Sequence, residues 1–169
     1  MLMRPEGQSP RRRRRHSDPE QPEITFGWEP FGLIARELRP LFVRHYAERP
    51  NGSIPFDLDW DRLFDYANRG ILHAWTARAD AVLIGYIGYV LTTALHTQTL
   101  RLAIADAIYL VPEWRLGMLG LEMWRASEAA LKDDDMADFV EMDTNDPRLI
   151  KALSRDGFKQ YAVQLRKAL

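Results

Sequence analysis

Hydrophobic positions change their spacing repeatedly from residue 24 onward, and the spacing predicts the secondary structure. Apolar residues that recur every three or four positions are typical of amphipathic helices, whereas alternating or short continuous apolar runs are typical of strands. The predicted order is one strand, two helices, three strands, a helix, a strand, a helix and a strand. These elements fall at residues 24–29, 30–48, 57–70, 71–77, 81–91, 100–111, 116–132, 138–143, 146–157 and 161–169. The alternation in the second half predicts an α/β fold, with helices on both faces of a mixed sheet.

The first two predicted helices carry recognisable start, stop and break signals. Pro40 lies inside the first helix, where we expect it to kink or break the helix, because proline lacks an N–H and crowds the preceding turn. The second helix can be capped by Asp57 or Asp59, and Gly70 suits its far end.

The three consecutive strands begin with a hairpin signature. Two β-rich runs, 71–77 and 81–91, flank the polar segment 78–80, which is the predicted turn. The third run, 100–111, is almost continuously apolar. A strand of this kind is expected to be buried on both faces.

Composition limits the function classes. The 169 residues, with a mass of 19.6 kDa, suggest one domain. The absence of cysteine excludes disulfides, zinc–thiolate sites and a thiol nucleophile, and it fits a reducing compartment. No apolar run reaches the ~18 residues of a membrane span, and no apolar core follows the basic N-terminus as in a secretory signal. We therefore expect a cytoplasmic protein without a membrane partner.

The charge is divided unevenly. Six arginines and four acidic residues give residues 1–24 a net charge of +2, so the remainder carries −3 of the total of −1. Residues 1–23 predict a disordered arm with an arginine run at 11–15, followed by a globular domain at 24–169. The arm could contact phosphates, RNA or an acidic partner, or it could be a solvated tail or the product of an unused upstream start. The domain itself shows no basic stripe of the kind that binds nucleic acid.

The segment "YLVPEWRLGMLGLEMW" joins a strand to a helix through two glycines, Gly117 and Gly120. Helix N-termini expose unpaired N–H groups and attract phosphate, and glycines allow a diphosphate close to the backbone. Arg115 adds a cation, so the segment predicts a phosphate cradle. It is neither a P-loop nor a dinucleotide fingerprint. The alternative is that the glycines only allow close packing of the helix on the sheet.

The same segment resembles the acetyl-CoA loop of the GNAT superfamily of N-acetyltransferases. There, a central strand ends in V-x-P-E-Y-R and continues as Arg/Gln-x-x-Gly-x-Gly/Ala into a helix. Arg115 and Gly120 match the first and last positions, Met118 stands where the middle glycine is usual, and Gly117 lies one residue early.

A second segment, "DTNDPRLIKALSRDGF", is similar to the superfamily's Asn-x-x-Ala-x-x-Leu-Tyr-x-x-x-Gly-Phe segment. Asn145, Gly157 and Phe158 are the recognisable points. Residues 55–91 and 94–99 further resemble a phage-encoded branch, so the resemblance covers about residues 24–169.

The resemblance implies a GNAT-like mixed, mostly antiparallel central sheet and acetyl-CoA as co-substrate, without a metal. It implies that the pyrophosphate lies on backbone N–H groups of 116–120, that backbone groups of Leu110 and Val111 hold the pantetheine arm, and that the thioester enters between two splayed strands. The implied binding residues are Leu110, Val111, Arg115, Leu116, Gly117, Met118, Leu119, Gly120 and Asn145.

Acetyl transfer to an amine requires removal of a proton from a group with a pKa near 10.4. Asp106 is the first candidate base. Strand alternation places it on one face with Ile104, Ile108 and Leu110, where we expect burial to raise its pKa. The superfamily's glutamate base would fall at Ile104, and the alternative for Asp106 is a structural role as a loop cap.

Other candidates for proton transfer are weaker. Glu141 and Asp143 lie on the next strand, where carboxylates are commonly solvated or paired. His96 and His73 could relay protons, or they could be surface or packing residues. The superfamily's tyrosine acid falls at Leu153, so Tyr109, Tyr161 or water would replace it. The acidic run 133–135 lacks the spacing of a calcium loop and predicts no metal site.

Three functions remain open from the sequence. The first is a GNAT-type N-acetyltransferase, acting by direct transfer on a small-molecule or protein amine, in the cytoplasm of a host cell if phage-encoded. The second is a GNAT-fold binding or virion-associated module that has lost catalysis, suggested by Met118 and Leu153. The third is a nucleic-acid-associated protein that binds weakly through its arm. A monomer and a homodimer are equally compatible with the sequence.

Overall fold

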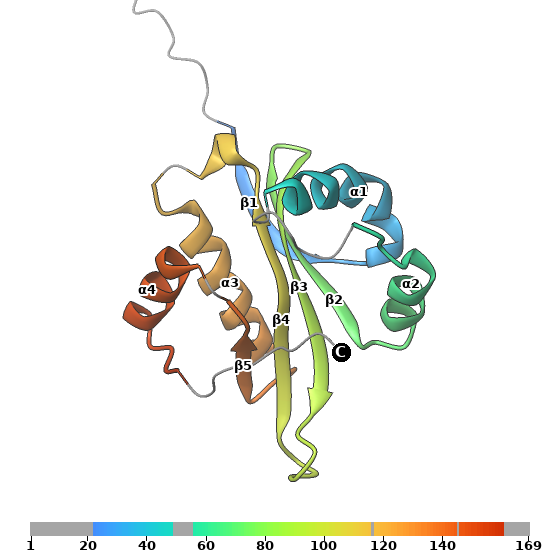
Figure 1. Cartoon of the computed structure of the whole chain (residues 1–169), viewed down its shortest axis with the longest axis vertical. Helices are drawn as coiled ribbons and strands as arrows, with labels where there is room; N and C mark the ends of the chain where they lie inside the picture. Colours follow the sequence, from blue (N-terminus) through green and yellow to red (C-terminus); the bar gives the residue numbers. More distant parts are fainter. Residues whose placement is uncertain (1–21, 49–55, 116, 145, 161–169) are drawn as a thin grey trace, which may run out of the picture.

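In the computed structural model, a five-stranded sheet lies between two layers of helices (Figure 1). The structure describes residues 22–48, 56–115, 117–144 and 146–160. The strands lie side by side in chain order, antiparallel except for the last pair, which is parallel. Their bounds are β1 Ile24–Glu29, β2 Leu72–Ala79, β3 Val82–Thr93, β4 Arg101–Leu110 and β5 Phe139–Met142.

The helices divide between the two faces of the sheet. Helices α1 (Phe31–Ala47) and α2 (Trp60–Asn68) cover one face, and α3 (Leu119–Asp133) and α4 (Pro147–Arg155) lie on the other (Figure 1). A 3-10 turn, η1 (Pro112–Trp114), connects β4 toward α3. The fold class predicted from the sequence is confirmed.

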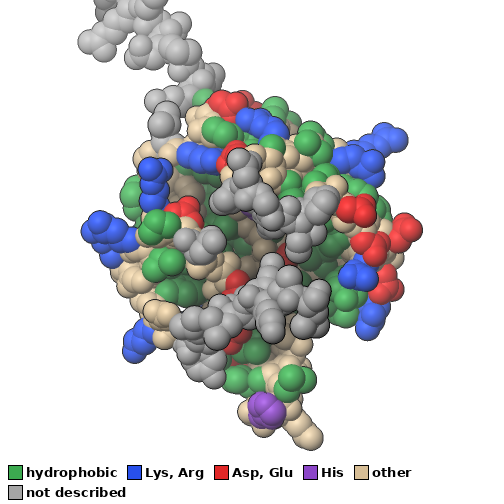
Figure 2. All heavy atoms as spheres, in the orientation of Figure 1, with side chains coloured by type: hydrophobic (Ala, Val, Ile, Leu, Met, Phe, Trp, Pro, Cys, Tyr) green, Lys and Arg blue, Asp and Glu red, His purple; other side chains and the backbone are tan. Residues whose placement is uncertain are grey.

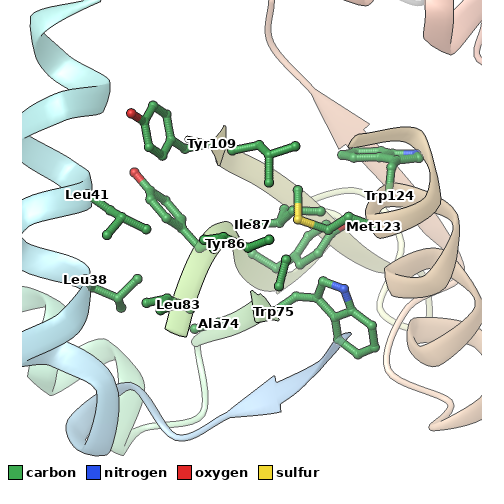
Figure 3. Close-up of a cluster of buried hydrophobic side chains, with 14 of the residues drawn as sticks. Leu38, Leu41, Ala74, Trp75, Leu83, Tyr86, Ile87, Tyr109, Met123 and Trp124 are labelled. Carbon is green, nitrogen blue, oxygen red and sulfur yellow. The ribbon is translucent and has the colours of Figure 1, made fainter. Parts of the chain in front are cut away.

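Two hydrogen bonds from neighbouring β3 tyrosines identify the faces. Tyr86 Oη lies 2.8 Å from His45 Nδ1 of α1, and Tyr89 Oη lies 2.8 Å from Ser127 Oγ of α3. Figure 3 shows the apolar core on both sides, with Leu38 of α1 on one side and Met123 of α3 on the other. The two core layers therefore lie on opposite faces of the same strands.

Of the two expected effects of Pro40 on helix α1, a kink or a break, the break does not occur. The helix runs without interruption across Pro40, which is exposed. The carbonyl that loses its partner, that of Arg36, also belongs to an exposed residue and can be hydrated. Leu38 and Leu41 are buried on either side of the proline and anchor both halves of the helix to the sheet.

The hairpin turn lies later than predicted. β2 and β3 pair as far as Ala79 with Val82, which leaves Asp80 and Ala81 as the turn. Asp80 adopts φ +53, a conformation that aspartate tolerates better than most residues. The predicted helices at 116–132 and 146–157 are present within shorter bounds. The strand predicted at 161–169 and the arm predicted at 1–23, apart from its last two residues, lie outside the described residues.

Candidate functional site

A β-bulge interrupts β4 at Asp106. On the β3 side, Gly88 pairs with Ala107 and Tyr89 pairs with Ala105, so Asp106 is an extra residue without a partner in the register. A bulge bends the strand and resets its alternation. The strand therefore presents different faces before and after Asp106.

The pairing of β4 with its second partner, β5, ends at the same place. The parallel pairing with β5 ends at Ala105 and Met142. No other described strand pairs with that edge of β4 between Asp106 and Leu110. The resemblance predicts that a thioester enters between β4 and β5, and this unpaired edge lies beside that position.

The open edge leads into the glycine turn and the start of α3. Gly117 has φ +68, which favours glycine, and Met118 then takes the N-cap position with no side-chain hydrogen bond. The first N–H groups of a helix have no carbonyl partner within the helix, so this end of α3 can receive an anion. A Cβ at Gly120 would lie 4.0 Å from the nearest atom, in the Leu110 side chain, which is ordinary contact. Close packing therefore does not require glycine at position 120.

Arg115 holds the end of β4 to the end of α1. Its Nε donates to the Leu110 carbonyl at 2.6 Å, and its Nη2 lies 2.7 Å from Glu48 Oε2. The guanidinium also lies 5.1 Å from the centre of the Tyr109 ring. Arg115, the side chain predicted to contact phosphate, is thus already paired with the carboxylate of Glu48.

Glu48 belongs to a polar cluster that the sequence did not reveal. Its Oε1 accepts a 3.2 Å hydrogen bond from Tyr109 Oη, and His45 stacks on the Tyr109 ring with centroids 5.0 Å apart. Burial, with the nearby Glu48 carboxylate, raises the pKa of Tyr109 above its usual range. Tyr109 therefore keeps its proton near neutral pH and donates its hydrogen bond to Glu48. Its partners on α1 are more than sixty residues away along the chain, so no local motif indicates the cluster.

A cavity of about 70 Å³ lies between α1, α2 and the sheet. Its lining includes Phe31 and Phe42 from α1, Leu63 from α2, Tyr86 from β3 and Asp106 from β4. The bulge thus places one carboxylate-bearing residue at a hollow whose other lining residues are mainly apolar and aromatic, with His73 beside them.

The structure corrects two expectations about Asp106. It is exposed, so the predicted burial is wrong. The bulge also separates Asp106 from the face of Leu110, whose side chain lies against Gly120 at the start of α3. The prediction that Asp106 shares a face with Leu110 holds only for a strand without a bulge.

The other candidate catalytic residues are dispersed. Glu141 is exposed on β5 and pairs with Ile104, beside the paired part of β4. His96 is exposed in the loop between β3 and β4, which Figure 1 shows at the end of the sheet opposite η1. His73 lines the cavity and lies 3.0 Å through Nε2 from the Gly70 carbonyl. Only Asp106 and His73 are therefore brought to the same hollow.

The predicted backbone contacts have mixed outcomes. Val111 already donates its N–H to Ile84 and accepts from Trp114, so its N–H is not free for a pantetheine arm. Met118 has a half-exposed side chain. Leu153, at the position of the superfamily's tyrosine, is buried in the core. Leu116, Asn145 and Tyr161 lie outside the described residues.

The described residues offer little support for a metal site or a membrane span. Within residues 22–48, 56–115, 117–144 and 146–160, no group of three or more metal-ligating side chains is present, and no helix is long and apolar enough to cross a membrane. On the face seen in Figure 2, the coloured basic and acidic side chains are interspersed and form no continuous basic stripe.

Comparisons with known proteins were made by sequence and by structure. No protein-family model matches the sequence, and no curated protein is significantly similar to it. Solved structures match over most of their length. An aminoglycoside acetyltransferase, meta-AAC0020, from an uncultured soil metagenomic sample in complex with sisomicin has a TM-score of 0.66 at 16% identity, covering 86% of this chain and 96% of that one.

Two further structures agree. A GCN5-related N-acetyltransferase from Ralstonia eutropha JMP134 has a TM-score of 0.67 at 13% identity, with 86% and 99% of the two chains covered. A predicted acetyltransferase with acetyl-CoA from Clostridium acetobutylicum has a TM-score of 0.65 at 13% identity, with 86% and 96% covered. At these identities the likeness shows the fold, which is that of the GNAT acetyltransferases.

Proposed function

We propose that this protein is an acetyl-CoA-dependent N-acetyltransferase that transfers the acetyl group directly to an amine. The observation that carries the proposal is the course of β4. The strand loses its β5 partner at Ala105, bulges at Asp106, and its open edge runs into the glycine turn and uncapped N-terminus of α3. Acetyl-CoA supplies an activated acyl group and a diphosphate, and this arrangement offers a place for each.

The start of α3 would hold the diphosphate. Unpaired helix N–H groups and the helix dipole favour an anion there by about 0.3–1 kcal/mol when exposed, and more when partly buried. Gly117 supplies the turn that brings the backbone to this position, and Arg115 is a cation two residues before it. To contact the phosphates, Arg115 must give up its ion pair with Glu48.

Asp106 would accept the proton of the attacking amine. In the transfer, the amine nitrogen forms a bond to the acetyl carbonyl carbon, and the bond from that carbon to sulfur breaks. The amine's proton goes to the Asp106 carboxylate or through water to solvent, and CoA leaves as the thiol. Tyr109, protonated near neutral pH, lies at the end of β4 and is a candidate donor to the departing sulfur. The sequence contains no cysteine that could carry the acyl group as a thioester, which favours direct transfer.

Calorimetric titration with acetyl-CoA tests the proposal. We expect binding by the wild type and no measurable binding by Gly120→Asp, because the added carboxylate occupies the anion site. An aspartate is compatible with the first turn of a helix, and the space around Gly120 is open, so this variant is expected to fold. Gly120→Ala is the control for bulk without charge. Absence of binding at millimolar acetyl-CoA would overturn the proposal.

The catalytic role is tested separately with Asp106→Asn. Loss of a general base typically lowers the rate by about 10²–10⁴-fold. We expect such a loss in kcat, with the dissociation constant for acetyl-CoA unchanged. An unchanged kcat would remove Asp106 from the mechanism and leave the fold and the cofactor site unaffected.

A binding module without catalysis is the second candidate. Its support is the pairing of Arg115 with Glu48 and the buried leucine at position 153. Acetyl-CoA binding without thiol release, over a panel of amines at pH 7 to 9, would favour this alternative.

A further inference from the structure

We infer that the acceptor is a compact, apolar primary amine carrying a single positive charge, bound in the cavity between α1, α2 and the sheet. The inference rests on the proposed acetyltransferase function and specifies its substrate class. It depends on three properties of the cavity, namely its walls, its size and its charge.

The walls are apolar and aromatic. Helix α1 contributes Phe31, Leu38 and Phe42, helix α2 contributes Leu63, and β3 contributes Tyr86. Phe42 and Tyr86 meet edge to face, with centroids 4.8 Å apart, so this wall is packed in one arrangement. Burial of apolar ligand surface is favourable here, and aromatic faces also attract an ammonium group.

The size restricts the ligand. The cavity of about 70 Å³ is several times the 10–15 Å³ that one water requires, so it accommodates about five to six heavy atoms. This matches a short branched alkyl group or a single aromatic ring. An aminosugar or a long polyamine would leave most of its polar surface outside.

The charge restricts the ligand further. Among the described residues that line the cavity, Asp106 is the one carboxylate, and no lysine or arginine is present. One carboxylate can pair with one ammonium group. A ligand with several ammonium groups would leave the others unpaired near apolar walls. A carboxylate on the ligand would meet no lysine or arginine there, and the lining His73 already contacts the Gly70 carbonyl through Nε2. The structure therefore favours a monoamine over polyamines, aminoglycosides and free amino acids.

Two glycines provide a matched pair of variants. Gly88 lines the cavity, and a Cβ at this position would meet no atom within 4 Å. Gly88→Val therefore adds a side chain at the cavity whose Cβ meets no neighbouring atom. Gly27 of β1 also has nothing within 4 Å of an added Cβ and does not line the cavity, so Gly27→Val makes the same change elsewhere in the sheet.

The experiment measures thiol release from acetyl-CoA with isobutylamine and 2-phenylethylamine, and with spermidine, kanamycin and leucine for comparison. We expect kcat/KM for the two apolar amines to exceed that for the other three by at least about 10-fold. In Gly88→Val, KM for the apolar amines should rise at least about 10-fold while the dissociation constant for acetyl-CoA is unchanged. Gly27→Val should resemble the wild type.

The outcomes separate the two claims. Efficient acetylation of spermidine, kanamycin or leucine, or an unchanged KM in Gly88→Val, would overturn the inferred substrate class and leave the acetyltransferase function standing. Absence of acetyl-CoA binding in the wild type would overturn the proposed function, and the acceptor inference with it.

Discussion

Gly117 and Gly120 are three residues apart, and the backbone distinguishes them sharply. Gly117 has φ +68, whereas Gly120 lies in the first turn of α3 in open surroundings. We expect Gly117→Ala to destabilise the protein by about 1 kcal/mol, because a Cβ disfavours the left-handed region. Gly120→Ala should be neutral or stabilising by up to about 1 kcal/mol, since alanine favours helix.

Urea unfolding at pH 7 checks this comparison. The contrast separates the two explanations for the glycine pair. A stable Gly120→Ala variant with weakened acetyl-CoA binding would assign that glycine to the ligand, whereas destabilisation of both variants alike would contradict the different roles.

Glu48 and Arg115 form the second residue-scale prediction. If Arg115 must leave Glu48 to contact phosphate, then Glu48→Gln removes the competitor. We expect acetyl-CoA to bind about 2–5-fold more tightly in this variant, corresponding to the ~0.4–1 kcal/mol typical of exposed ion pairs. Calorimetry at low and high salt measures the effect, which should shrink with salt.

Glu113→Gln is the control for this experiment. Glu113 hydrogen bonds to Arg44 at the same end of the molecule, so the substitution removes the same charge without releasing Arg115. Equal gains in both variants would indicate a general electrostatic effect. Weaker binding in Glu48→Gln would show that the pair positions Arg115 rather than restraining it.

At the scale of elements, Arg78 joins the hairpin to helix α1 and strand β1. It contacts Glu29 at 2.8 Å and Glu37 at 2.8 Å, and its side chain is 19% exposed. We expect Arg78→Met to cost about 1–3 kcal/mol, because a half-buried Glu29 loses its charged partner. Arg69→Met, whose pair with Asp65 is exposed, should cost no more than about 0.5 kcal/mol.

The same cluster gives a pH dependence. Hydrogen bonds from Arg78 hold the pKa of Glu29 and of Glu37 below the usual range. Their stabilising contribution is therefore present above the pKa of an unfolded glutamate and is lost as the pH falls through the lowered folded values. In urea titrations, the difference between wild type and Arg78→Met should be largest at neutral pH and should shrink below about pH 4. A constant difference would contradict this account.

The elements also show what the sequence could supply. Helices and strands with long, regular apolar spacing were predicted in the right order, because that spacing reflects which face is buried. Pro40 does not break α1, since two buried leucines outweigh one lost hydrogen bond on an exposed side. The bulge at Asp106 was missed, because alternation along β4 gives no indication of an extra residue that only the pairing with β3 defines.

The site was predictable only where it is local. The glycine turn and the start of α3 are adjacent in sequence, so their spacing could be recognised. The contacts of Glu48 with Arg115 and Tyr109 depend on the packing of α1 against the end of β4. No spacing within either segment carries that information. The same holds for the cavity, whose walls come from five separate elements.

At the scale of the whole molecule, β4 is the link between the antiparallel strands and β5. In the described part of the sheet, β5 pairs only with β4, through four residue pairs. Arg101, at the start of β4, reinforces this link through hydrogen bonds to Asp135 and Asp138 in the segment that leads to β5. We expect Arg101→Gln to increase hydrogen exchange in β5 while β1, β2 and β3 stay protected.

Acid should remove the same reinforcement in the wild type. Hydrogen bonds from Arg101 hold the pKa of Asp135 and of Asp138 below the usual range. The reinforcement is thus present at neutral pH. It is lost as the pH falls below about 4, the ordinary pKa of aspartate, and through the lowered pKa values of the folded state. Arg62→Gln, which breaks an exposed ion pair on α2, is the control for Arg101→Gln. Faster exchange spread evenly over all strands in Arg101→Gln would contradict a local link.

The bulge at Asp106 also has a consequence for how the sequence can change. The residue pairs on either side of it, Tyr89 with Ala105 and Gly88 with Ala107, are consecutive on β3. Deleting the single codon for Asp106 would therefore join two ladders that are already matched, and every flanking side chain would keep its face. A gene of this kind can gain or lose its candidate base by one three-nucleotide insertion or deletion, without passing through a misfolded intermediate. The candidate base and the fold are in this respect separately heritable.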